Sequence, residues 1–274
     1  MAETAVGRLP PLACVAFDAI TTSLVIDGRF ELEELTALET HVFPRLAARE
    51  VCLDIGANIG NHAVFFADHF HRVLAFEPHP RIFRLLELNA ELRDNIEVFQ
   101  VGLSDRAGRV SAAPLPGNVG TTSIRRADQG GDGGAAQVAF DVVRLDDIDE
   151  VRALERVDFV KIDVEGHEVE ALEGARETLM RHRPVVALEV LGEDIADGSS
   201  AAIELLKSFG YAHVHALQSN RPFARAPKPV ARLATALMGL LLDRRPPKRF
   251  TVEPVERLER RNYPIVLVSV APLV

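Results

Sequence analysis

The residues best suited to chemistry lie in one short segment, KIDVEGHE (161–168). Carboxylate and imidazole side chains are the usual proton-transfer groups of enzymes, and this segment places three of them within five residues: Asp163, Glu165 and His167. We predict that these three are catalytic, and that His167 is the first candidate for a general base. Asp163 then either orients the imidazole or takes the proton itself.

The elements around this segment are predicted to be a buried strand over 157–163 and a helix over 167–182. At the N-terminus of that helix the helix dipole disfavours the imidazolium ion, so His167 stays in the neutral form that accepts a proton. Two alternatives remain open. The segment is only a strand-to-helix joint, or Asp163 and Glu165 bind a divalent Mg²⁺ or Ca²⁺ ion together with Glu189. No spacing requires a metal, so no metal ligand is assigned.

A second candidate site follows the strand predicted over 51–55, in DIGANIG (54–60). Its glycines allow a backbone to pass close to a ligand and turn into a helix. Glu77 ends the next strand, 21 residues after Gly56, where a carboxylate can accept hydrogen bonds from both ribose hydroxyls. The predicted cofactor-binding residues are Asp54, Gly56, Ala57, Asn58, Gly60, Glu77, Ser104, Asp105 and Asp163.

The chemistry of this turn favours a positively charged ligand. Its spacing is G-x-N-x-G instead of G-x-G-x-x-G, and the carboxylate of Asp54 suits a cation better than a pyrophosphate. Asp105 is placed to meet the amino group of an adenine. From these residues alone a nicotinamide cofactor stays open, as do interpretations in which Asp54, Asn58 and Asp105 only shape turns.

Strands and helices alternate from residue 51 onward. The central strands are continuous apolar runs, as expected when helices cover both faces of a mostly parallel sheet, and we therefore predict a doubly wound, Rossmann-like α/β domain. Residues 103–135 are expected to be irregular. Residues 1–50 should add a strand pair (13–27) and an amphipathic helix (31–49) that pack on the domain formed by 51–274. The expected strands are 51–55, 73–77, 96–101, 138–143, 157–163, 184–191, 211–217 and 264–270.

Several motifs of this chain resemble the FkbM-type methyltransferase family: DIGANIG (54–60), FEPHP (76–80), TSI (122–124), VVRLDDI (142–148) and KIDVEGHE (161–168). The resemblance implies a class I methyltransferase fold with a seven-stranded sheet. It also implies S-adenosyl-L-methionine as the cofactor and an O-methyltransferase that acts on a hydroxyl of a sugar, glycan or natural product. An NAD-dependent oxidoreductase and a non-catalytic S-adenosylmethionine-binding module are the alternatives.

The composition limits the partners and the compartment. A formal net charge of −9 argues against nucleic acid, which needs a cationic face. Cys14 and Cys52 have no metal-ligand spacing, and free thiols favour a reducing, cytoplasmic location. Neither a signal peptide nor an apolar run long enough for a transmembrane segment is apparent. We therefore expect a cytoplasmic protein with a small-molecule or glycan acceptor.

A basic insertion, 221–249, interrupts the pattern. It holds eight Arg or Lys residues against one Asp, around the apolar stretch VARLATALMGLLL (230–242). Three interpretations are open: a lid over the acceptor, an interfacial helix in peripheral membrane contact, and a contact in a homo-oligomer. We favour the lid, and the basic charge suggests an acceptor that carries phosphate.

Overall fold

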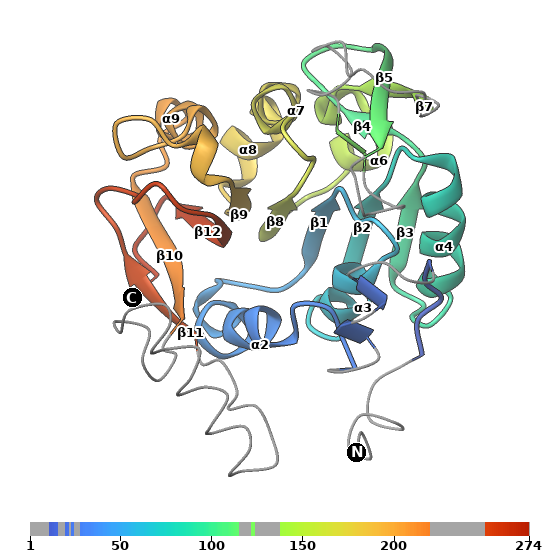
Figure 1. The fold of residues 1–274 in the computed structure, drawn as a ribbon, viewed down its shortest axis with the longest axis horizontal. Coiled ribbons are helices and arrows are strands. Elements are labelled where there is room, and N and C mark those ends of the chain that lie inside the picture. Colours follow the sequence, from blue (N-terminus) through green and yellow to red (C-terminus); the bar gives the residue numbers. More distant parts are fainter. Residues whose placement is uncertain are drawn as a thin grey trace.

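A twisted eight-stranded sheet forms the centre of the molecule (Figure 1). The computed structural model describes residues 11–15, 20–21, 23–24, 28–114, 122–123, 138–219 and 250–273. The strand order is β11-β10-β12-β9-β8-β1-β2-β3. The bounds are β1 Val51–Ile55, β2 Arg72–Phe76, β3 Ile96–Phe99, β8 Phe159–Ile162, β9 Val185–Val190, β10 His213–Ser219, β11 Phe250–Pro254 and β12 Tyr263–Ser269.

Most of this sheet is parallel. Strands β3, β2, β1, β8 and β9 run in one direction, while β12 is antiparallel to both β9 and β10, and β11 is antiparallel to β10. The predicted α/β class is confirmed. The predicted count of seven strands is one short, because β11 follows the basic insertion and adds an eighth strand at the edge.

Helices cover both faces of the sheet. Successive residues of β1 point to opposite faces and pack against different helices. Leu53 packs in the apolar cluster that includes Leu172, Leu179 and Leu206, whereas Cys52 packs in the cluster that includes Phe66. The first face is covered by α6 (Asp149–Arg152), α7 (Glu168–Gly174), α8 (Arg176–His182) and α9 (Ala201–Ser208), and the second by α2 (Leu32–His41), α3 (Asn61–Ala67) and α4 (Pro80–Ala90).

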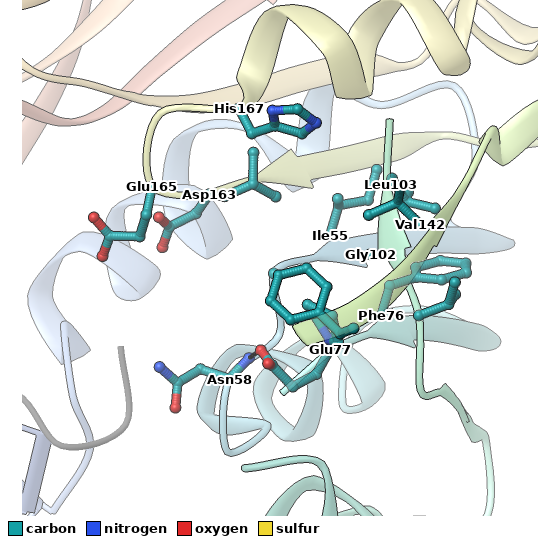
Figure 2. A pocket seen from close by; sticks show the side chains of 15 residues that line it. Ile55, Asn58, Phe76, Glu77, Gly102, Leu103, Val142, Asp163, Glu165 and His167 are labelled. Carbon is teal, nitrogen blue, oxygen red and sulfur yellow. Dashed lines mark hydrogen bonds between the residues drawn. The ribbon is translucent and has the colours of Figure 1, made fainter. Parts of the chain in front are cut away.

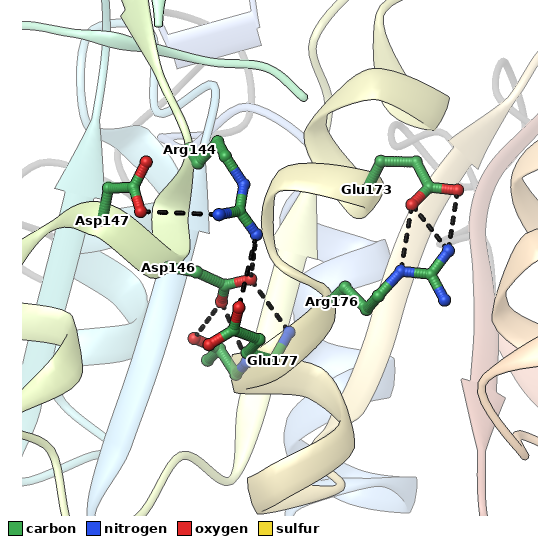
Figure 3. Close-up of polar contacts among 7 residues, drawn as sticks. Arg144, Asp146, Asp147, Glu173, Arg176 and Glu177 are labelled. Atoms are coloured by element: carbon green, nitrogen blue, oxygen red, sulfur yellow. Dashed lines mark hydrogen bonds and ion pairs between the residues drawn. The ribbon is translucent and has the colours of Figure 1, made fainter. Parts of the chain in front are cut away.

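The helix predicted over 167–182 is two helices, α7 and α8, which meet at Ala175. Asp146, in the 3-10 helix η2 (Leu145–Asp147), caps the second of them. Its carboxylate accepts hydrogen bonds of 2.9 Å from the backbone N–H groups of Glu177 and Thr178 (Figure 3). Backbone N–H groups in the first turn of a helix have no partner within the helix. This long-range cap therefore stabilises a new helix start that the local sequence did not indicate.

A small second sheet lies beside the main one, in the order β4-β7-β5-β6 (Figure 1). Its strands are β4 Gly102–Leu103, β5 Gly108–Pro114, β6 Thr122–Ser123 and β7 Val138–Val143. The prediction that 103–135 is irregular is therefore wrong at β5 and β6. Residues 115–121 and 124–135 of that range lie outside the described residues.

The N-terminal region also differs from its prediction. Residues 20–21 and 23–24 are helical, and 11–15 form no strand, so the strand pair predicted over 13–27 is wrong at these positions. The predicted helix over 31–49 ends at His41 and continues as the 3-10 helix η1 (Phe43–Arg45), which holds Pro44. The basic insertion, 221–249, lies outside the described residues. Within the described part of the chain, none of the helices has the length and hydropathy to cross a bilayer.

The order of the strands places a crevice between β1 and β8. The chain runs outward from β1 to β2 and β3, and then returns to the other side of β1 as β8. Ligands of open α/β sheets bind at such a reversal, beyond the carboxyl ends of the strands. Ile55 and Ile162 are paired at the ends of these two strands, so Gly56 and Asp163 follow them at the crevice.

Candidate active site

Two cavities open at this edge of the sheet, and they share the lining residues Asn58, Asp163 and Glu165. The first cavity has a volume of about 710 Å³ and lies over the ends of β1, β2 and β8 (Figure 2). The second cavity has a volume of about 780 Å³ and extends to β9, β12 and the N-terminal segment.

The turn after β1 forms one wall of the first cavity. Gly56 and Asn58 both have positive φ, of 77° and 51°, and the N–H groups of Gly56 and Ala57 donate to the carbonyl of Phe76. A Cβ atom on Gly56 would lie 1.8 Å from the carbonyl oxygen of Asp163, so only glycine fits there. Ala57 and Gly60 shape this turn. Neither of them is among the described residues that line the two cavities.

Glu77 lies at the end of β2, where the sequence predicted it, and its carboxylate lines the first cavity. It accepts hydrogen bonds from the backbone N–H groups of Asn58 at 3.1 Å and His79 at 2.8 Å. Burial nevertheless raises the pKa of Glu77 to about 7. These two bonds fix the carboxylate, and each oxygen retains capacity to accept a bond from a ligand.

The opposite half of the first cavity is apolar. Phe76, Leu103, Phe140 and Val142 line it, and the ring of Phe76 stacks on Phe99 with centroids 4.9 Å apart. Figure 2 shows Phe76 between the polar end at Asn58 and Glu77 and the apolar end at Leu103 and Val142. This combination suits a ligand with a flat heterocycle joined to a polyhydroxyl group.

Asp163 and Glu165 lie together at the junction of the two cavities (Figure 2). Glu165 has a positive φ of 52°, which is strained for a residue with a side chain. Burial and the neighbouring carboxylates of Asp163 and Glu168 raise the pKa of Glu165 to about 7. Glu168 accepts a hydrogen bond of 2.9 Å from Gly166 N–H and so helps to hold this turn.

His167 is placed differently from the expectation. Its ring lines the first cavity but not the second, away from the carboxylates of Asp163 and Glu165 (Figure 2). Its Nε2 lies 2.9 Å from Ser104 Oγ and its Nδ1 lies 3.4 Å from Glu170 Oε2. The side chain turns back along the start of α7. Its position therefore suits contact with a ligand in the first cavity.

Asp54, Ser104 and Asp105 do not line the first cavity, although a direct ligand contact was predicted for each. Asp54 is fully buried, and its Oδ1 lies 3.3 Å from Lys161 Nζ. Ser104 bonds His167 and donates to Asp105 at 3.2 Å. Successive side chains point in different directions along the chain. Ile55 and Leu103, the neighbours of Asp54 and Ser104, therefore line the cavity instead.

Lys161 joins the two strand ends electrostatically. Its ammonium group lies 3.5 Å from Asp163 Oδ2 and donates to the carbonyl of Gly56 at 2.7 Å, in addition to its contact with Asp54. These nearby carboxylates outweigh burial and raise the pKa of Lys161, so the ammonium stays charged. Lys161 therefore forms ion pairs with both Asp54 and Asp163.

The second cavity contains residues that the sequence did not indicate. Phe30 and Glu31 reach it from the N-terminal segment, and Glu31 Oε2 lies 3.2 Å from His62 Nε2. No local spacing connects these residues to KIDVEGHE, so only the tertiary structure reveals them. Glu189, on β9, joins Asp163 through a side-chain hydrogen bond, and burial together with the neighbouring carboxylates raises its pKa above the ordinary range.

The carboxylates of Asp163, Glu165 and Glu189 were also considered as ligands of a divalent metal. In the part of the chain that the structure describes, no group of three or more His, Cys, Asp or Glu side chains has an arrangement that would hold a metal ion.

Comparison with known proteins gives consistent matches. The sequence profile of the Methyltransferase FkbM domain matches residues 54–212. Methyltransferase sdnD of Sordaria araneosa is 28% identical over 182 residues, covering 56% of this chain and 70% of that protein. Hexuronic acid methyltransferase AglP of Haloferax volcanii is 30% identical over 149 residues, covering 54% of this chain and 59% of that protein. 2-O-methyltransferase NoeI of Sinorhizobium fredii is 28% identical over 175 residues, covering 58% of this chain and 72% of that protein.

Proposed function

Since the chain belongs to the FkbM methyltransferase family, whose profile matches residues 54–212, we propose that it transfers a methyl group from S-adenosylmethionine to a hydroxyl oxygen. The first cavity would hold the donor and the second cavity the acceptor. The observation that carries this assignment is the junction between them, where Asp163 and Glu165 line both cavities. A methyl group at that junction would face an acceptor from the other side.

The donor site follows from the chemistry of the first cavity. Glu77 accepts hydrogen bonds from the ribose hydroxyls, and the adenine lies among Phe76, Leu103 and Val142. The methionine end of the donor then lies near Gly56, where Asp163 and the turn after β1 meet. His167 borders the apolar end and contacts the donor instead of the acceptor.

The residue placed to remove the acceptor proton is Glu165. The oxygen of the acceptor attacks the methyl carbon in line with the carbon–sulfur bond, which breaks and leaves S-adenosylhomocysteine. The proton of the hydroxyl passes to the Glu165 carboxylate, whose raised pKa of about 7 matches a base that works near neutral pH. Asp163 holds Lys161 and keeps the strand end in place, 3.5 Å from its ammonium group.

The acceptor class proposed is a sugar, a glycan unit or a natural product. Two relatives support a sugar, since one is named a hexuronic acid methyltransferase and the other a 2-O-methyltransferase.

The test has two steps. Isothermal titration with S-adenosylhomocysteine should give binding, and NAD should give none; tight binding of NAD alone would overturn the proposal. The second step incubates the chain with S-adenosylmethionine that carries a labelled methyl group and with a panel of glycans and small alcohols. Mass spectrometry then locates the label, which we expect on an oxygen and which should be strongly reduced with Glu165→Gln.

A further inference from the structure

Acidic side chains outnumber basic ones in the wall of the second cavity. Four of the described residues that line it have carboxyl groups: Glu31, Asp163, Glu165 and Glu189. The fixed positive charge among these lining residues is that of Lys161, whose ammonium group already lies within 3.3 Å of Asp54 and 3.5 Å of Asp163. It also donates to the carbonyl of Gly56 at 2.7 Å. Its charge and donors are therefore engaged within the protein.

The closely spaced carboxyl groups raise one another's pKa values. Burial and the Asp163 carboxylate raise the pKa of Glu165 to about 7, and they also raise the pKa of Glu189. An additional anion in this cavity would add to the repulsion. A hydroxyl or an ammonium group, by contrast, would donate hydrogen bonds to carboxylate oxygens, which only accept them.

The remaining walls of the second cavity are apolar. Phe30, Leu35 and Leu38 line it from the N-terminal side, and Leu188 and Ile265 line it from β9 and β12. A ligand that fills this space places a polar end at the carboxylates and an apolar body along these side chains.

Glu31 is held in the wall by a network of buried contacts. Asn61 forms two hydrogen bonds with the backbone of Phe30, at 3.2 Å and 2.9 Å, and its own carbonyl accepts a bond of 3.0 Å from Arg29. Arg29 is 2% exposed. These bonds fix the chain just before Glu31, whose carboxylate then lies 3.2 Å from His62. The carboxylate is thus a fixed part of the cavity.

We propose that the second cavity selects acceptors whose reacting end is an uncharged hydroxyl or a cationic amine on an apolar body, and that Glu31 is a specificity-determining residue that disfavours anionic acceptors. This inference rests on the proposed function, which assigns the acceptor to this cavity. Glu31 lies outside the family match at residues 54–212, so the selectivity is a property that the N-terminal segment of this chain adds. A phosphate on a carrier group would have to stay outside the cavity.

The experiment compares three probes that differ only in their polar end: hexylamine, 1-hexanol and hexanoate. The full chain, saturated with S-adenosylhomocysteine and labelled with ¹³C in its Ile and Leu methyl groups, is titrated with each probe at pH 7.5. We expect hexylamine and hexanol to shift the methyl signals of Leu188 and Ile265. Hexanoate should bind at least about tenfold more weakly than hexylamine. The carboxylates repel the negative charge of hexanoate and attract the positive charge of hexylamine, and in a partly buried site this difference corresponds to more than a tenfold change in the dissociation constant.

Two variants locate the effect. Glu31→Gln should reduce the ratio of the hexanoate dissociation constant to the hexylamine dissociation constant by about threefold or more. The reduction is partial because the other acidic side chains of the cavity remain. Glu39→Gln, on the exposed face of helix α2, which begins one residue after Glu31, removes the same charge and should leave the ratio unchanged. Equal binding of hexanoate and hexylamine, or no probe binding at Leu188 and Ile265, would overturn the inference. Failure of S-adenosylhomocysteine to bind would instead overturn the proposed function.

Discussion

The backbone of Gly56 lies against the backbone carbonyl of Asp163, so close that a Cβ atom on Gly56 would be 1.8 Å from the Asp163 oxygen. The two residues follow the neighbouring strands β1 and β8, and Lys161 joins them through bonds to the Gly56 carbonyl and the Asp163 carboxylate. This contact brings the proposed donor turn and the proposed catalytic carboxylates into one rigid unit.

The first prediction concerns this contact. Gly56→Ala should lower the free energy of unfolding by more than about 2 kcal/mol, because the side chain must displace the β8 end and adopt a positive φ of 77°. It should also abolish S-adenosylhomocysteine binding. Urea denaturation and calorimetry measure the two effects. Gly108→Ala is the control, since its nearest neighbour would be 4.0 Å away. A Gly56→Ala protein with wild-type stability would contradict the rigid unit.

The second prediction concerns Glu77 and the ribose. Hydrogen bonds to a charged group contribute about 1.5–3 kcal/mol, so Glu77→Gln should weaken S-adenosylhomocysteine binding by about 10–100-fold. The pKa of Glu77 is raised to about 7, and ribose hydroxyls favour the ionised carboxylate. Affinity of the wild type should therefore rise about tenfold from pH 6 to pH 8.

Calorimetry across this pH range checks the assignment of Glu77. The pH dependence should vanish in Glu77→Gln and persist in Glu87→Gln, an exposed change on α4. Wild-type affinity that is constant between pH 6 and pH 8 would argue against a ribose contact at Glu77.

The fold and the polar wall of the first cavity at Gly56, Asn58 and Glu77 were predictable because they depend on local sequence. The apolar run of β1, the turn DIGANIG and the carboxylate of Glu77 are adjacent in the chain, and their geometry follows from strand ends and glycines. The family resemblance drawn from the same motifs is confirmed by the profile match over 54–212.

The lining of the second cavity was not predictable in the same way, because long-range packing decides it. Whether His167 points toward the second cavity depends on Ser104, 63 residues earlier, which holds its ring in the first cavity. Asp54 was expected to meet the ligand, but the alternation of β1 directs it to Lys161. Glu31 lines the second cavity, and Asn61, 30 residues later in the chain, binds the backbone just before it.

The third prediction separates the two candidates for the general base. Glu165→Gln should lower kcat by about 10²–10⁴-fold, with little change in S-adenosylhomocysteine affinity. His167→Ala should mainly raise the KM for S-adenosylmethionine, because its ring lines the first cavity alone. With Glu165 as the base and its pKa at about 7, the wild-type rate should rise with pH up to about 7 and then level off.

Steady-state kinetics with the acceptor found by methyl labelling measure these parameters. A kcat for His167→Ala reduced as far as that of Glu165→Gln, at unchanged KM, would restore His167 as the base.

The fourth prediction follows from the buried carboxyl group of Glu189. Its pKa in the folded protein is raised, so the folded state binds more protons than the unfolded state, in which Glu ionises near 4.3. The linkage relation then gives a stability that falls as pH rises from that value toward the folded pKa. Glu189→Gln removes this loss. As the pH rises from 6 to 8.5, the free energy of unfolding of the variant should therefore increase by about 1–2 kcal/mol relative to that of the wild type. This figure is discounted for the partial exposure of Glu189.

Urea denaturation of both proteins at several pH values gives this difference, in which the titrations of histidine residues cancel. Glu87→Gln, which removes an exposed charge from α4, should show no comparable trend with pH. The opposite slope, with Glu189→Gln losing stability relative to wild type as pH rises, would mean that Glu189 is stabilised as a carboxylate. Glu189 would then be charged in the folded protein near neutral pH, contrary to its raised pKa.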